Sequence, residues 1–306
     1  MAKRASPVRL IGCVALLGIA FWFSVCALLT PLGPWLARGA AGLMQGVANL
    51  PGIAWAREQA AGASSSTVET GTTNPSAAVK EALRAGLALQ KEGKLQAALE
   101  RYREALNLDQ AYAPTHAALA SLYHDLGQDD QALQELERAA ELDPSNGYIH
   151  AQLGQFYLHR ERYEEAVAAL ERATGALPED AEVHSLLGAA CYYRAHEDLN
   201  RAVSALEKSV ELAPDQAQTH LRLAMAFVRR DEEGDVERAI ASLERAVSLD
   251  PQQTEAYYYL GQLYSRNGDT RKAAAVWQHY VEVGQDSEAV ARVRAWLESL
   301  EKGSDD

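Results

Sequence analysis

The chain has 306 residues, of which 48% are hydrophobic, and a formal net charge of −13. The first 57 residues carry only basic charges, so the remainder holds 24 basic and 42 acidic residues, a net charge of −18. A body this acidic repels phosphate groups, which argues against nucleic acid as a partner. The three cysteines, Cys13, Cys26 and Cys191, supply neither a disulfide framework nor a Cys-x-x-Cys pair.

Residues 10–29, LIGCVALLGIAFWFSVCALL, form an apolar run with no charged residue between Arg9 and Arg38. Twenty helical residues span about 30 Å, the thickness of the bilayer hydrocarbon. The run therefore predicts a single transmembrane helix. The basic residues within 1–9 favour an N-terminus left in the cytoplasm. We therefore expect the body of the protein on the other side of the membrane. The high Ala content and the short loops favour a bacterial inner-membrane protein, whose body would then lie in the periplasm.

Other interpretations of this region stay open. A cleaved signal peptide has a shorter apolar core, and a lipoprotein box at residues 10–13 has no apolar run before it. Residues 39–56 are uncharged and could return across the bilayer, which would place the body in the cytoplasm. We expect instead that residues 30–57 form a juxtamembrane or interfacial segment, with Trp35 and Trp55 at the level of the headgroups.

Residues 58–77 are rich in Ser, Thr, Ala and Gly and contain few large apolar side chains. This composition predicts a flexible linker. Twenty such residues give a root-mean-square reach of about 25 Å. The linker would hold the body near the membrane and let it reorient.

The body contains a repeated pattern. Prolines at 144, 178, 214 and 251 follow one another at steps of 34, 36 and 37 residues. Small residues recur at the same step, with Leu-Gly pairs ending at Gly154, Gly188 and Gly261, and an alanine column recurs further on. A period of this length is typical of a solenoid of helix pairs, because each pair can bury its apolar face only against its neighbours.

These motifs closely resemble the tetratricopeptide repeat. The resemblance covers residues 78–287 and implies an all-α, TPR-like solenoid of about six helix-turn-helix units: 79–112, 113–146, 147–180, 181–216, 217–253 and 254–287. Units four and five carry extra residues, at 194–200 and 229–236, in the turn between their helices. Residues 288–306 are predicted to form an amphipathic capping helix and tail.

The resemblance also implies a concave groove lined by the first helix of each unit, which binds a peptide or a helix of a protein partner. The groove positions are Tyr148, Gln155, Leu158, Ser185, Ala189, Tyr192, Leu221, Met225, Tyr258, Gln262 and Ser265. The family's chaperone-binding subgroup clamps a terminal carboxylate with Lys, Asn and Arg. Those places hold Leu83, Leu87, Ala118, Tyr148 and Gln152 here, so that clamp is absent.

No catalytic motif is present, and we predict neither enzymatic activity nor a cofactor. Histidines recur at the fourth position of four units, at His116, His150, His184 and His220. Equivalent side chains of adjacent units lie about 10 Å apart, whereas zinc holds its ligands at about 2 Å. We therefore predict no metal site and expect these imidazoles to pack between helices.

Together these features predict a membrane-anchored adaptor or scaffold that binds protein and supports assembly of a membrane or envelope complex. Two alternatives remain: an integral subunit held mainly by its transmembrane helix, and a cytoplasm-facing repeat protein with a membrane hairpin.

Overall fold

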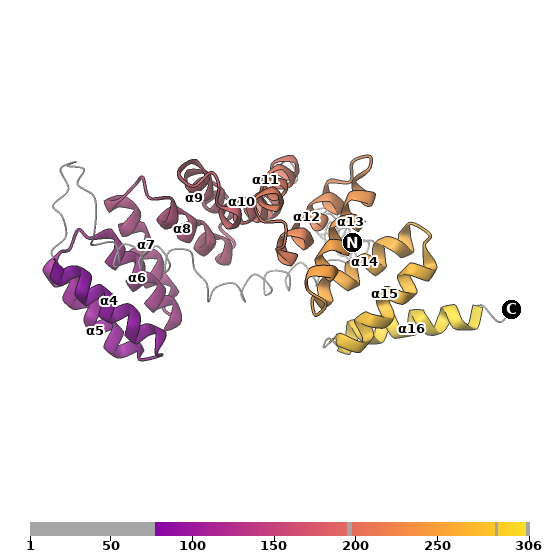
Figure 1. Ribbon diagram of the computed structural model, residues 1–306, viewed down its shortest axis with the longest axis horizontal. Coiled ribbons are helices and arrows are strands. Elements are labelled where there is room, and N and C mark those ends of the chain that lie inside the picture. The colour runs from indigo at the N-terminus through magenta and orange to yellow at the C-terminus, as the bar shows by residue number, and fades with distance from the viewer. Residues whose placement is uncertain (1–76, 195–197, 285–286, 304–306) are drawn as a thin grey trace, which may run out of the picture. The chain divides into compact units, whose positions relative to one another are not determined.

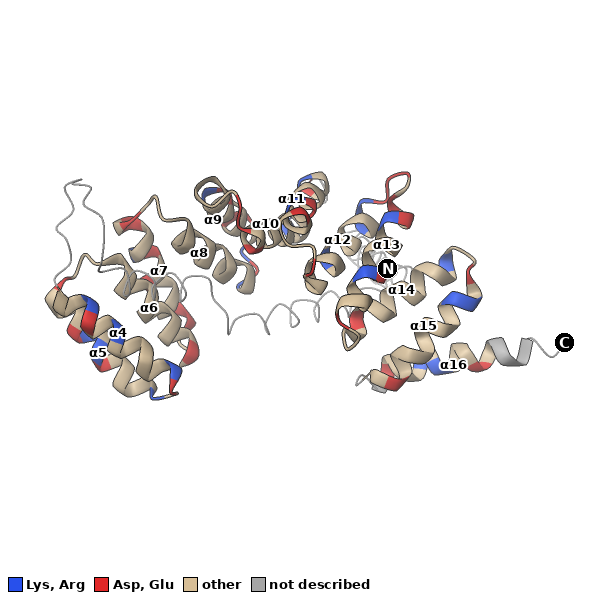
Figure 2. Ribbon diagram, viewed as in Figure 1, with Lys and Arg blue, Asp and Glu red and all other residues tan. Residues whose placement is uncertain are grey.

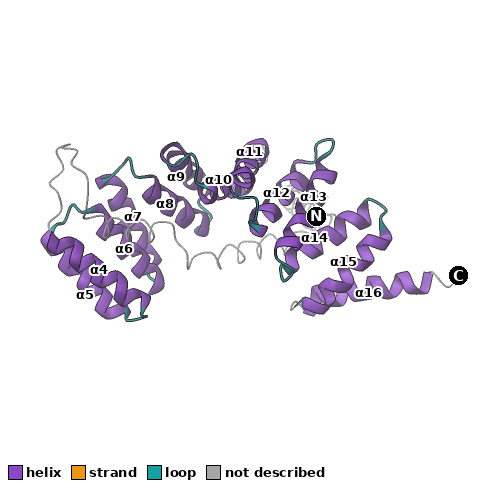
Figure 3. Ribbon diagram, viewed as in Figure 1, coloured by secondary structure: helices purple, strands orange, loops and turns teal. Residues whose placement is uncertain are grey.

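The computed structural model describes residues 77–194, 198–284 and 287–303. Within these ranges it contains thirteen α-helices and no strand (Figure 1 and Figure 3). The predicted all-α, TPR-like solenoid is thereby confirmed. The helices are α4 (Ala77–Lys91), α5 (Leu95–Leu108), α6 (Ala113–Asp125), α7 (Asp129–Leu142), α8 (Gly147–His159), α9 (Tyr163–Ala176), α10 (Ala181–Arg194), α11 (Leu199–Leu212), α12 (Ala217–Arg230), α13 (Asp235–Leu249), α14 (Thr254–Arg266), α15 (Thr270–Val283) and α16 (Ser287–Gly303).

None of these thirteen helices combines the length and the apolarity that a bilayer span requires. The transmembrane helix expected at 10–29 lies outside the described residues, as do the segments expected at 1–9 and 30–57 and the linker up to residue 76.

The first twelve helices form six hairpins, α4–α5 through α14–α15, whose two helices pack against each other. The second helix of each hairpin also packs against the first helix of the next. Each internal hairpin therefore buries its apolar surface between two neighbouring hairpins, as in a solenoid.

Proline ends the second helix of four hairpins. The residues before Pro144, Pro178, Pro214 and Pro251 have φ between −128° and −139°, outside the helical range. A proline ring clashes with the backbone of the preceding residue in an α conformation and pushes it to an extended one. Proline thus determines where these four hairpins end.

The turns inside the hairpins are of two kinds. Short turns contain one residue with positive φ, which is Gly93, Gly127 or Gly268 in three hairpins and Glu161 (φ 56°) in α8–α9. The longer turns follow α10 and α12, where the sequence carries its extra residues. There an arginine that ends the first helix bonds an aspartate that begins or precedes the second: Arg194 with Asp198, and Arg230 with Asp235.

Small residues let the two helices of a hairpin approach closely. A Cβ atom on Gly154 would lie 2.3 Å from Cγ of Leu170, and one on Gly188 would lie 2.5 Å from Cγ of Leu206. The alanine column of the second helices is fully buried: Ala98, Ala132, Ala166, Ala202, Ala239 and Ala273 are all 0% exposed. These positions make the apolar core that joins one hairpin to the next.

The last helix, α16, packs on α15. Its residues Ala289, Val290 and Val293 are buried, and Trp296 meets Trp277 of α15 edge to face with ring centroids 4.4 Å apart. Arg292, Arg294 and Glu298 face solvent. This arrangement covers the apolar end of the sixth hairpin.

Candidate functional site

The first helices of neighbouring hairpins touch one another. Direct contacts join α4 with α6, α8 with α10, and α10 with α12. We call the surface formed by α4, α6, α8, α10, α12 and α14 the first-helix face. Helix α8 contains no Lys, Arg, Asp or Glu, and α6 contains only Asp125, whereas α7 carries five acidic residues and one arginine (Figure 2). The first-helix face is therefore the part of the array with the least charge to solvate.

The structure places the predicted groove residues at two depths. Part of the set keeps surface that a partner could reach: Tyr148, Gln155, Met225, Tyr258, Gln262 and Ser265 are half-buried. The rest are buried: Leu158 and Tyr192 are 8% exposed, Ala189 is 3% exposed, and Ser185 and Leu221 are 0% exposed. The buried positions pack the array, so contact with a partner falls to the half-buried ones.

A guanidinium group on this face lacks a carboxylate partner. Nη1 of Arg222, on α12, donates a hydrogen bond to Oγ of Ser185 on α10 at 2.7 Å. Ser185 in turn lies 3.3 Å from Oγ1 of Thr219. Nε of Arg222 is shielded from solvent and has no hydrogen-bond partner among the described residues. Burial lowers the pKa of Arg222, and the nearby Glu182 opposes that shift without forming an ion pair.

A second unpaired charge lies on the next first helix. Glu255 of α14 is half-buried and has no cationic partner among the described residues. Burial alone raises the pKa of its carboxyl group. Its negative charge acts on the tyrosines of the face, Tyr193 and Tyr259, and burial raises the pKa of Tyr193 to about 12.

Aromatic side chains surround these charges. The rings of Tyr192 and Tyr193 meet edge to face with centroids 5.0 Å apart, and Tyr193 stacks on Tyr163 at 5.6 Å. The guanidinium of Arg229 lies 4.8 Å from the centroid of the Tyr192 ring and donates a hydrogen bond to the Tyr192 carbonyl. The guanidinium of Arg229 thus has partners on Tyr192, whereas Nε of Arg222 has none among the described residues. Sequence reasoning missed Arg222 and Glu255, because both helices carry other charged residues and the sequence does not show which of them lack an ion-pair partner.

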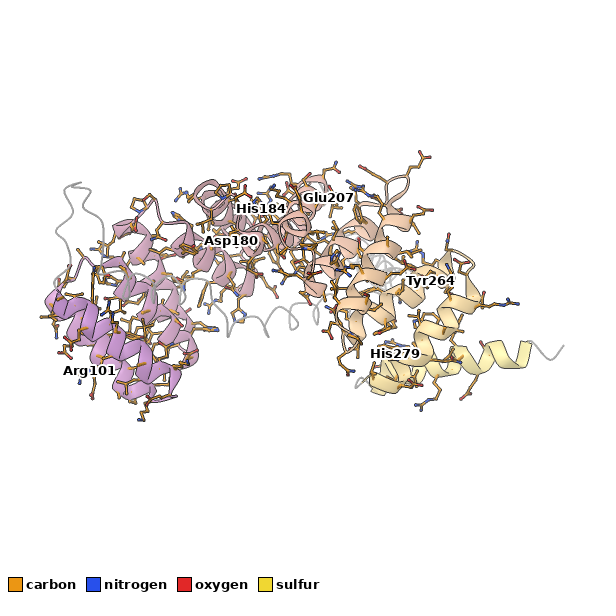
Figure 4. All side chains as sticks on the ribbon, viewed as in Figure 1. Arg101, Asp180, His184, Glu207, Tyr264 and His279 are labelled. Carbon is orange, nitrogen blue, oxygen red and sulfur yellow. The ribbon has the colours of Figure 1, made fainter. Side chains whose placement is uncertain are left out.

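The recurring histidines have a shared structural role. Nε2 of His150, His184 and His220 lies 2.9 Å from the carbonyl oxygen of the proline six residues earlier. Nε2 of His116 lies 3.0 Å from the carbonyl oxygen of Gln110. A carbonyl oxygen only accepts, so Nε2 carries the proton in each case. Each histidine therefore ties a first helix to the turn before it; His184 lies beside Asp180 of that turn in Figure 4. Among the described residues, no group of three or more His, Cys, Asp or Glu could hold a metal ion.

Models of known repeat families match the sequence of this helical array. The model of the cytochrome c-type biogenesis protein H TPR domain matches residues 177–289, and tetratricopeptide-repeat models match 130–190, 86–127 and 113–146. No curated protein sequence matches the chain significantly. Between them, tetratricopeptide-repeat models match residues 86–289, in agreement with the repeated helical hairpins of the fold.

Solved structures share the fold. PilF of Pseudomonas aeruginosa is 23% identical, with a TM-score of 0.63, over 73% of this chain and 99% of its own. PilW, described as a widely conserved type IV pilus biogenesis factor, is 16% identical, with a TM-score of 0.61, over 70% of this chain and 97% of its own. YrrB, described as a TPR protein with an unusual peptide-binding site, is 22% identical, with a TM-score of 0.53, over 63% of this chain and 97% of its own.

Proposed function

We propose that this tetratricopeptide-repeat protein is a membrane-anchored adaptor that binds a protein partner on its first-helix face and supports assembly of a membrane or envelope complex. The observation that carries the proposal is the first-helix face itself. It is poor in charge, it presents Tyr148, Met225 and Tyr258 half-buried, and it holds an arginine with unmet donors. Aromatic, thioether and amide groups on a preformed surface suit an incoming apolar segment, because little ordering is required on binding.

An assembly role is favoured by the printed names of the similar proteins. The family model over 177–289 is named for cytochrome c-type biogenesis, and PilW is described as a pilus biogenesis factor. YrrB is described as having a peptide-binding site. These names support protein recognition during the building of a larger assembly.

The membrane anchor is proposed from the sequence. Residues 10–29 are apolar and uncharged, and basic residues precede them. We place the N-terminus in the cytoplasm and the repeats outside it. Protease treatment of sealed inner-membrane vesicles tests this orientation. Digestion of the repeats in inside-out vesicles would contradict it and favour the membrane hairpin.

Site-specific crosslinking in living cells tests the binding face. Met225→Glu puts a charge on the first-helix face, and Ala168→Glu puts the same charge on the exposed surface of α9. We expect the crosslinked partner to be lost in the Met225 variant and kept in the Ala168 variant. Equal behaviour of the two variants would contradict binding on this face.

Removal of residues 1–57 separates the adaptor from the intramembrane subunit. An adaptor that binds through its repeats keeps its partner after the deletion, when both are supplied in solution. A subunit held by its transmembrane helix loses its partner.

A further inference from the structure

The strongest unmet interaction in the described part of the chain is at Arg222. An arginine presents five N–H donors in a planar fork. In Arg222 one donor is taken by Ser185, Nε is shielded without a partner, and no hydrogen bond from Nη2 is present among the described residues. A shielded donor left unpaired is unfavourable, and more so in a charged group. The free edge of the fork, Nε with Nη2, has the geometry that binds a carboxylate through two parallel hydrogen bonds.

We propose that Arg222 binds an acidic side chain, Asp or Glu, of a partner polypeptide docked across α10, α12 and α14. This inference rests on the protein-binding role proposed for the first-helix face and assigns the chemistry of one contact.

The surroundings select a polypeptide over a polyanion. The charge of Glu182 on α10 acts on Arg222, and Glu255 on α14 acts on Tyr193, as Arg222 does. Neither carboxylate has an ion-pair partner among the described residues. Phosphate-rich ligands would meet these like charges, and the body as a whole carries excess negative charge. A single carboxylate brings less negative charge against them than a phosphate-rich ligand does, and its apolar neighbours bring none. The apolar neighbours would contact Tyr193 and Tyr259, which are half-buried beside the charges.

The depth of the donor selects a side chain over a chain terminus. Nε is shielded from solvent while Arg222 as a whole is half-buried, so a partner group that reaches Nε has to enter between the side chains that cover it. The carboxylate of Asp or Glu is separated from its backbone by one or two methylene groups and can enter while the backbone stays outside. A terminal carboxylate would have to bring its own backbone with it.

Selection from a phage library of random dodecapeptides, fused through their C-termini and so lacking a free terminal carboxylate, tests the proposal on the full-length protein. We expect the selected peptides to be enriched in Asp or Glu at one position. Replacing that residue by Asn or Gln in the synthetic peptide should raise the Kd about tenfold or more for the wild type, as expected for a charged hydrogen-bonded pair.

Three variants complete the measurement. Arg222→Gln should reduce the effect of the acid-to-amide change to less than twofold. Arg222→Lys, which keeps the charge but loses the fork, should give an intermediate value. The control is Arg172→Gln, which removes an exposed charge from α9 that makes no hydrogen bond or ion pair with the residues the structure describes, and should behave like the wild type. Circular dichroism confirms that the variants fold.

The outcomes separate clearly. The proposal is overturned if the acid-to-amide change costs the same in wild type and Arg222→Gln, or if the selected peptides lack an acidic position. Peptides that depend on Met225 but show no coupling to Arg222 would overturn this inference and leave the proposed function standing. Arg222-dependent binding only of synthetic peptides with a free C-terminus would assign the contact to a chain terminus instead. A wild type that selects nothing until Glu58 and Glu69 are both changed to Gln would show that the chain's own acidic residues occupy the site.

Discussion

Replacing Gly154 by Ala tests the close approach of the two helices in the hairpin α8–α9. The added methyl group would lie 2.3 Å from Cγ of Leu170, well inside the 3.4 Å at which ordinary contact begins. Cγ is the branch point of a side chain that is 0% exposed, so it cannot swing away. Overpacking of this kind costs about 1–3 kcal/mol. Alanine also stabilises a helix interior by about 1 kcal/mol relative to glycine, so the net loss should be about 0–2 kcal/mol.

The matched control lies in the same hairpin. Gly175, near the end of α9, is exposed, and a Cβ atom there would meet nothing within 4 Å. Gly175→Ala makes the same chemical change with no clash and should stabilise the protein by up to about 1 kcal/mol. The helix-propensity contribution largely cancels between the two variants. Their difference in stability, about 1–3 kcal/mol, therefore measures the steric cost at Gly154.

Urea denaturation followed by circular dichroism gives the two midpoints. Hydrogen exchange of the α8 and α9 amides gives the local stability, because a repeat array can unfold in parts. We expect the Gly154 variant to have the lower midpoint and faster exchange in this hairpin. Two variants of equal stability would refute the argument that the hairpin is closed too tightly for a methyl group.

Three further predictions concern the turns and a histidine. Glu161→Gly should raise stability by about 0.5–1 kcal/mol in urea denaturation, because Glu161 holds a left-handed φ of 56° that costs a non-glycine residue energy; an unchanged or lower midpoint would contradict this. Asp235→Asn should cost about 2 kcal/mol at pH 7, because it breaks the pair with the largely buried Arg230. The hydrogen bond to Arg230 lowers the pKa of Asp235 despite its burial, so this stabilisation is present above the unfolded pKa of about 3.9 and is lost as the pH falls through the folded value; a loss that does not shrink in acid would refute the assignment. Although burial opposes it, hydrogen bonding to Glu135 raises the pKa of His116, so stability is gained below about pH 6.5 and lost as the pH rises through the folded pKa; Glu135→Gln should therefore destabilise more at pH 6 than at pH 9, and equal losses would argue against the pair.

The sequence was sufficient to predict the fold, because two independent sets of residues, the prolines and the small residues, show the same repeat period. Pro144 and its equivalents end four of the hairpins, and Gly154 and its equivalents let the second helix of a hairpin approach the first closely. The extra residues after α10 and α12 fall in turns, where added chain costs little.

The candidate site was less predictable. The position of a residue in a helical pattern indicates which way its side chain points, but not how deeply that side chain is buried. The family's groove positions predicted that Ser185, Leu221 and Met225 all line the groove. In the structure Ser185 and Leu221 are 0% exposed, whereas Met225 is half-buried. Arg222 stands one residue after Leu221, outside the family's groove positions, and only the three-dimensional arrangement shows that its Nε has no partner. Depth and hydrogen-bond satisfaction depend on the neighbouring hairpins, which a single helical pattern does not contain.

The carbonyl–imidazole bonds have a consequence for how such an array can change in length. Each one joins a hairpin to the turn that precedes it, across six residues, and uses nothing further along the chain. A stretch of DNA encoding one turn and the hairpin after it is therefore a complete cassette. Duplication or excision of that cassette would carry these bonds with it, so only the packing between the newly adjoining hairpins would have to match.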